Sequence, residues 1–428
     1  MVLNYIWIGF FIVALIVALV RTIGYFLQQG LDITLWTTFT IEDRDVFHAI
    51  VDSTFDTAET SVKIAIYLIG IMTLWLGIMK IGEKGGAVNM LSWLVSPFFR
   101  KIFPEVPDRH PAMGAMMMNF CANMLGLDNA ATPLGLKAMK ELQEINPDKD
   151  TASNAQIMFL VLNTSGLTII PISILGLRAA AGAENPADIF LPLLLTTFFS
   201  TMAGLIAVAV VQRINLFNKI VLLYLAGLSI LVGGLFAFLS TLPEEKMGVF
   251  SILAGNIILF GFIIFFLFAG IKKRINVYET FIEGAKEGFE VAVKIIPYLV
   301  AMLFAIGIFR VSGALDFIID GISAIFAWMG FDTRFVEGLP TALMKPLSGS
   351  GARGMMVEIL ENKDFGPESF AGRLVSILQG STETTFYTLA VYYGAVNIKK
   401  TRYTITCGLL ADLTAIIAAI LLTYYFFG

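Results

Sequence analysis

The sequence predicts an all-α polytopic membrane protein made of two inverted repeats, with about nine transmembrane helices. Of its 428 residues, 57 % are hydrophobic and 14 % are charged, whereas soluble domains average about 25 % charged residues. Polar stretches at 163–168 and 379–385 interrupt segments long enough to cross a bilayer, and each follows a polar turn, at 126–133 or 348–354. Paired interruptions in two halves are typical of the binding sites of secondary transporters.

Residues 1–55 are expected to form a leading transmembrane helix and an external loop. Residues 3–20 are apolar, and we expect an uncleaved helix there, with a secretory signal as the alternative. Residues 28–60 contain seven acidic side chains and a single basic one, Arg44. Because cytoplasmic loops are enriched in Lys and Arg, this acidic loop is predicted to lie outside.

Residues 56–213 are expected to form the first repeat. An apolar helix near 61–79 runs into a basic stretch, which places that end in the cytoplasm. Residues 85–103 have the pattern of an amphipathic helix in the membrane interface, with a buried helix as the alternative. Residues 111–143 are polar in the middle, which favours a re-entrant hairpin over one kinked helix.

The broken helix near 154–177 and the long helix near 188–211 complete this repeat. Two connecting helices are then expected in 214–275, with both basic flanks inside and an acidic turn outside.

Residues 276–428 are expected to form the second repeat. Its residues 293–299 are identical to 62–68 at five of seven positions, and the polar turn, the polar break and the last long helix recur in the same order. The helix at 61 ends in the basic inner stretch, whereas the helix at 293 begins from one. The repeats are therefore expected to be inverted, which places a shared binding site near the membrane midplane.

Polar groups at membrane depth are costly and are usually kept for a function. Glu383 among hydroxyls is the first candidate for binding a solute or a coupling ion, although a salt bridge to Lys345 would make it structural. Arg353 is a candidate for binding a negatively charged group, with an outward-facing basic residue as the alternative. The Asn and Thr side chains can instead hydrogen-bond between helices. The predicted solute- or ion-binding residues are Glu383, Ser381, Thr382, Thr384, Gln379, Arg353, Ser348, Ser350, Asn129, Thr132, Asp128, Asn163, Thr164, Ser165 and Asn123.

Several functions are not expected. His48 and His110 lack a second histidine or a cysteine at helical spacing, and no phosphate-binding loop or long basic run is present in the sequence. We therefore expect no metal, no cofactor and no nucleic-acid partner, and no enzyme activity, because no nucleophile stands beside a base in the sequence pattern.

The hairpin and break residues resemble a known group of proteins. Residues 123–139, with the run Gly126-Leu127-Asp128-Asn129, look like the signature of spore maturation protein A; residues 345–354 and 379–387 look like spore maturation protein B. The chain is thus similar to those two proteins fused end to end. The group carries the nucleoside recognition or gate domain, which is similar to the core of concentrative nucleoside transporters and of ferrous iron transporters. The resemblance implies re-entrant hairpins that meet broken helices, and a role in dehydration of the spore core.

Two functional hypotheses follow. The first is alternating-access secondary transport of a small polar, nucleoside-like solute coupled to H⁺ or Na⁺, in the cell (inner) membrane. The second is a membrane scaffold or regulator that does not transport. The expected partners are the lipid bilayer, the solute and its ion, and, as an alternative to a monomer, a second copy of the chain.

The predicted topology has the amino terminus inside and the carboxyl terminus outside. Cysteines introduced at Glu244 and Lys399 should react with an impermeant thiol reagent from opposite faces of intact cells, because the Lys and Arg distribution places these positions on opposite sides. Labelling of both from one face would contradict the inverted arrangement.

Overall fold

The computed structural model describes the chain except for residues 1, 31–37, 108–109, 127, 240 and 242–243. Throughout the described part, the regular structure is helical, with one isolated bridge between Thr151 and Lys400. The α-helices are α1 (Val2–Gly30), α2 (Ile41–Arg44), α3 (Val46–Gly85), α4 (Ala87–Ile102), α5 (Pro111–Met124), α6 (Asp128–Glu144), α7 (Asn154–Thr164), α8 (Ile172–Ala180), α9 (Phe190–Gln212), α10 (Lys219–Leu239), α11 (Glu244–Lys272), α12 (Val277–Val311), α13 (Ala314–Trp328), α14 (Leu339–Met344), α15 (Gly349–Glu361), α16 (Phe370–Gly380), α17 (Thr385–Gly394) and α18 (Thr404–Phe427), and a 3₁₀ turn, η1, covers Val336–Gly338.

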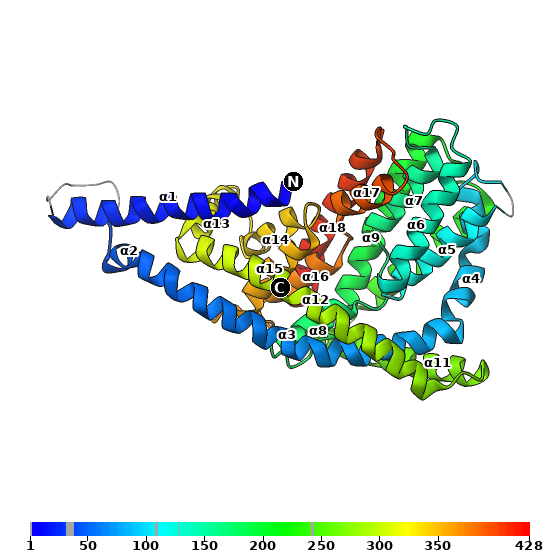
Figure 1. Ribbon diagram of the computed structural model, residues 1–428, viewed down its shortest axis with the longest axis horizontal. Coiled ribbons are helices and arrows are strands. Elements are labelled where there is room, and N and C mark those ends of the chain that lie inside the picture. The colour runs from blue at the N-terminus through cyan, green and yellow to red at the C-terminus, as the bar shows by residue number, and fades with distance from the viewer. Residues whose placement is uncertain (1, 31–37, 108–109, 127, 240, 242–243) are drawn as a thin grey trace.

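The two halves of the chain share one order of elements (Figure 1). Each starts with a long helix, α3 or α12, and turns into a shorter one, α4 or α13, through a left-handed glycine: Gly86 has a φ of 91° and Gly313 a φ of 84°. A helical hairpin follows, α5–α6 or α14–α15. An interrupted helix, α7–α8 or α16–α17, and a final long helix, α9 or α18, complete each half.

The long helices α3 and α12 pack against each other in opposite directions, and their backbones touch. A methyl group at Gly284 would lie 2.3 Å from the carbonyl oxygen of Leu76, and one at Gly288 would lie 2.4 Å from that of Met72. Glycines four residues apart form the G-x-x-x-G spacing that lets two membrane helices approach closely. The two halves are therefore joined at a position where no larger side chain fits.

Helix α1 lies before the first half and α11 before the second, and each packs against the long helix of the other half. Helix α1 packs on α12, where Trp7 Nε1 donates to the carbonyl of Ala301 at 2.9 Å and Arg21 Nη1 donates to that of Ser312 at 3.0 Å. Helix α11 packs on α3, with Ala269 against Gly85. The sequence places α1 outside the repeats, as a leading helix. In the structure α1 and α11 occupy matching positions, each on the long helix of the other half.

The chain is a multi-pass membrane protein. Six helices are long and apolar enough to cross a membrane, and a seventh span results if α12 and α13, which bend by 67°, count as one. These counts refer to the described residues. The helix expected at 85–103 is α4, whose Trp93 is 77 % exposed. Residues 111–144 form two helices packed on each other, not one kinked helix.

Replacing Gly288 by leucine should destabilise the protein by about 3 kcal/mol, because the new side chain meets the α3 backbone and forces the helices apart. The measurement is the unfolding transition of purified variants in detergent. Gly70→Leu is the matched control, since nothing lies within 4 Å of a methyl group at that position on α3. Equal stability of both variants would contradict the close crossing.

Candidate functional site

A cavity of about 830 Å³ lies between the two halves. Its wall includes the cytoplasmic end predicted for α3, Glu287 and Glu290 of α12, both helical hairpins and both breaks. Its volume is within the range of about 300–1,000 Å³ that is usual for sites of small ligands. One cavity therefore receives the polar segments of both halves.

The first hairpin is bonded to the first break. The backbone N–H of Ile169 donates to the carbonyl of Met124 at 2.7 Å, and the Asn123 amide donates to Asn163 Oδ1 at 2.8 Å. Gly126, with a φ of 69°, turns the chain so tightly that a methyl group there would lie 2.4 Å from the Ile170 carbonyl oxygen. The turn and the break thus satisfy each other's polar groups, which an apolar membrane would leave unpaired.

The second hairpin is bonded to the second break in the same way. The backbone N–H of Phe386 donates to the carbonyl of Pro346 at 3.0 Å, and Gln379 Nε2 donates to that of Gly349 at 3.3 Å. Ser348 accepts from the N–H of Gly351 at 3.0 Å and caps α15. Hairpin and break are therefore paired similarly in the two halves.

The two breaks also touch each other. The backbone N–H of Glu383 donates to the Thr164 carbonyl at 2.8 Å, and the hydroxyls of Thr164 and Thr385 are 2.6 Å apart. A methyl group on Gly166 would lie 3.8 Å from Cγ of Glu383. The two interrupted helices are therefore coupled: one cannot move unless the other moves with it or these hydrogen bonds break.

Charges of both signs line the cavity. Glu383 is exposed to it, and the buried Lys345 and the half-buried Arg353 come from the second hairpin. The side formed by α3 and α12 is mostly acidic and holds one lysine: Lys80 Nζ lies 2.9 Å from Glu287 Oε1 and 3.2 Å from Glu83 Oε2. A solute in this cavity meets both hydrogen-bonding carboxylates and cationic groups.

The structure brings five of the predicted binding residues to the cavity wall: Asn123, Arg353, Gln379, Thr382 and Glu383. Others lie behind the wall, where they bond to the backbone or to each other: Ser165 donates to the Leu162 carbonyl, Ser381 to that of Leu378, and Ser350 contacts Ser348. Asn163 and Thr164 hold the breaks in place, as described above, while the Thr384 hydroxyl faces Gly349. Thr132 is exposed and interacts with Tyr392. The side chains of Asp128 and Asn129 lie outside the described residues.

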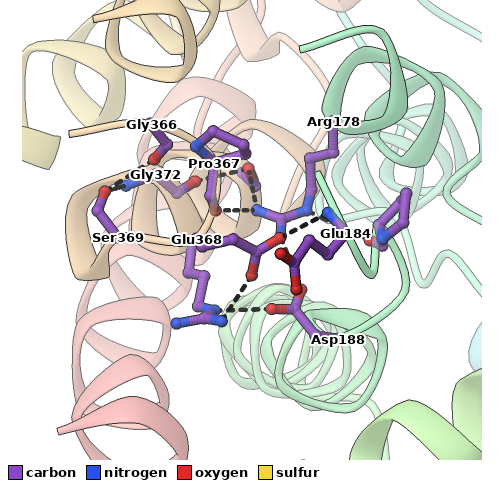
Figure 2. Close-up of polar contacts among 11 residues, drawn as sticks. Arg178, Glu184, Asp188, Gly366, Pro367, Glu368, Ser369 and Gly372 are labelled. Atoms are coloured by element: carbon purple, nitrogen blue, oxygen red, sulfur yellow. Dashed lines mark hydrogen bonds and ion pairs between the residues drawn. The ribbon is translucent and has the colours of Figure 1, made fainter. Parts of the chain in front are cut away.

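A second polar cluster, which the sequence did not indicate, joins the halves away from the cavity (Figure 2). The fully buried Arg178 lies 2.8 Å from Asp188, and the same carboxylate lies 2.7 Å from Arg373 of the second half. Arg373 also contacts Glu368 at 2.7 Å, and Arg178 donates to the Pro367 carbonyl at 2.9 Å. Arg178 lies in the last turn of α8 and Asp188 in the turn before α9, and such a pair gives no periodic signal. Only the isolated Arg178 in an apolar run marks it in the sequence.

The model of the Gate family, described as nucleoside recognition, matches residues 65–217 and 292–399. These two segments cover more than half of the chain. The chain belongs to the Gate family. The matched segments are those that contribute the two hairpins, the two breaks and most of the cavity wall described above.

Two curated relatives match different parts of this Gate protein. Spore maturation protein B of Bacillus subtilis is 49 % identical over 162 residues, which are 38 % of this chain and 88 % of that protein. Spore maturation protein A of the same organism is 39 % identical over 155 residues, which are 36 % of this chain and 79 % of that protein. The first half resembles protein A, and the resemblance predicted from the hairpin and break residues is confirmed. No solved structure matches the chain.

Asp188→Asn should cost about 3–5 kcal/mol of stability, because it leaves the buried Arg178 without its main counter-charge. The measurement is the melting temperature of the purified protein. Asp150→Asn serves as control: Asp150 also pairs across the halves, with Lys399, but both side chains are exposed and the pair should contribute little. Equal melting temperatures of the two variants would show that the buried cluster does not hold the halves together.

Proposed function

We propose that this Gate protein is an alternating-access secondary transporter of a small polar, nucleoside-like solute, coupled to H⁺ or Na⁺. The observation that carries the proposal is the single cavity to which both hairpins and both interrupted helices contribute. Secondary transporters place their substrate where the broken helices of two repeats meet, and they work by moving one repeat against the other.

The proposed topology has nine crossings in two inverted repeats. It counts α7–α8 and α16–α17 as interrupted spans, whose parts are 9 to 11 residues long and thus too short to cross alone. The opposite directions of α3 and α12 support the inversion. Two contacts support the assignment of sides. Asp150 meets Lys399 in loops assigned to the cytoplasm, and Asp188 meets Arg373, near the start of α16, on the side assigned to the exterior.

The lining favours a solute with several hydrogen-bonding groups. Gln379, Asn123 and Thr382 offer amides and a hydroxyl, and Glu383 offers a carboxylate that accepts from sugar hydroxyls or amines. Lys345 and Arg353 offer positive charge for carbonyl or anionic groups. A nucleoside combines a sugar with a base bearing both donors and acceptors, which fits this set. The names of the two relatives support a role in spore maturation for a host that forms spores.

A thermal-shift screen of the purified protein tests the solute class. Nucleosides, amino acids, organic acids and metal ions are compared, and a ligand of the folded state at a hundredfold excess over its Kd stabilises by about 2.7 kcal/mol. We expect nucleosides to raise the melting temperature. A non-transporting scaffold would show no shift with any of these compounds.

Glu383→Gln should abolish binding of the solute or its coupling ion while leaving the fold intact. The carboxylate is exposed to the cavity, and an amide of the same size is cheaper at membrane depth than a charge. The measurement is a pair: melting temperature, and binding or flux of the solute found in the screen. Glu59→Gln, on the exposed part of α3, is the control and should change neither.

A structural Glu383 would give the opposite pattern. If its carboxylate were one partner of a buried pair with Lys345, the substitution would lower stability by about 3–5 kcal/mol. Lost stability with retained binding would remove Glu383 from the site.

A further inference from the structure

A buried carboxylate stands behind the cavity, on a helix in which the sequence indicated no site. Asp412 lies in α18 and is the only charged residue among the 24 of that helix. The helix is a candidate membrane span, and Asp412 is 3 % exposed. An acidic side chain in a spanning helix is costly and is usually kept because it takes part in an ion or proton pathway.

Asp412 is bonded to both breaks through two threonines. Thr385, the first residue of α17, donates its hydroxyl to Asp412 Oδ2 at 2.6 Å. The Thr385 hydroxyl is also 2.6 Å from that of Thr164, the last residue of α7. All three side chains are buried. The carboxylate therefore ends a chain of oxygen atoms that joins the interrupted helix of one half to that of the other.

The second carboxylate oxygen, Oδ1, accepts no hydrogen bond from the residues that the structure describes. A carboxylate oxygen left without a donor inside an apolar span is a place where a proton or a cation binds. The Thr382 side chain lies beside the same carboxylate, and the positive charge of Lys345 attracts it. Both residues also line the cavity, so they connect Asp412 to the cavity wall.

Few other ionisable groups are near. Helices α7 and α9, which pack against α18, contain none, and α16 contains Arg373, which is held in the cluster of Figure 2. The remaining ionisable side chains on helices packed against α18 are Tyr387, Tyr392 and Tyr393 of α17 and, at the ends of α11, Glu244, Glu245, Lys246 and Lys272. Lys345 is therefore the charged group that most directly opposes a proton on Asp412, because its positive charge favours the carboxylate.

We propose that Asp412 is a proton-binding site whose occupancy controls the contact between the two breaks, an inference that rests on the proposed transport function. A hydronium ion in the cavity water transfers a proton to Oδ1, which forms one O–H bond and leaves a neutral carboxylic acid and a water molecule. Transfer of the proton back to water regenerates the carboxylate and the hydronium ion. Hydrogen bonds to a charged carboxylate are about twice as strong as those to a neutral group. Protonation therefore weakens the bond from Thr385 and loosens the chain that holds α7 and α17 to α18.

Two measurements on the full chain in lipid nanodiscs test this site without any solute. The first is infrared titration of the carbonyl band of protonated carboxylic acids. Asp412→Asn should lose one titrating band that the wild type shows, Thr385→Val should shift that band, and Thr385→Ser should restore its position. Asp320→Asn removes an exposed carboxylate of α13 and is the control for the loss of a surface acid. An unchanged band in Asp412→Asn would overturn the proposal.

The second measurement is hydrogen exchange of the peptides that contain Thr164 and Thr385. Exchange in the wild type should rise as the pH falls through the titration of the band, and exchange in Asp412→Asn should not depend on pH. If exchange of these peptides changes when Na⁺ replaces K⁺ at constant pH, Asp412 binds a cation and the proposal of a proton site is wrong. If Asp412→Asn fails to fold, the comparison of Thr385→Val with Thr385→Ser still tests the proposal, because both of these variants keep the Asp412 carboxylate. Failure of every solute to bind would contradict the proposed transport and leave these readouts unaffected.

Discussion

Glycines at 284 and 288 let the backbone of α12 meet the backbone of α3, and this contact determines where the other elements lie. Attraction between helices inside a bilayer comes from close packing more than from the hydrophobic effect, since lipid tails are as apolar as the side chains. Once the two long helices cross, α1 and α11 are each placed on the long helix of the other half. The hairpins that follow α4 and precede α16 are then directed toward one cavity.

The interrupted helices are stabilised because several backbone groups at each break find a partner in a hairpin or in the opposite break. Ile169 bonds to Met124 and Phe386 bonds to Pro346, so the same solution occurs in both halves. The Thr164–Thr385 contact then connects the two halves at the breaks in their helices. A segment that is held by such a small number of polar bonds can exchange them for bonds to a solute or lose them to a proton. The same features that make the breaks tolerable in a membrane thus make them suited to movement.

The sequence predicted which polar segments of the two halves come together, but not how the halves assemble; that these segments bind a solute or an ion stays a prediction. Polar residues within apolar segments are conspicuous, so the two breaks and the two turns were located, and Glu383, Gln379 and Arg353 were predicted to belong together. Asp412 was not predicted, because this carboxylate stands alone in an apolar span and not in a cluster of polar residues, although a lone carboxylate in such a span is itself a signal. Gly284 and Gly288 could not be assigned a partner, since α3 lies about two hundred residues away and contact between distant segments leaves no local pattern. For the same reason α1 was expected to stand apart from the repeats. The domain boundaries at 55, 213 and 275 stay predictions.

The cavity exists only where the two halves meet, and the match of different parts of the chain to two separate spore maturation proteins agrees with such a two-part assembly. The most direct test of this assembly is coexpression of residues 1–241 and 242–428 as two chains, with an affinity tag on the first. The cut falls between α10 and α11, so it leaves both Gate segments intact. We expect the two chains to purify together in equal amounts and to unfold in one transition. Recovery of the tagged chain alone, folded and stable, would show that the first half does not need the second.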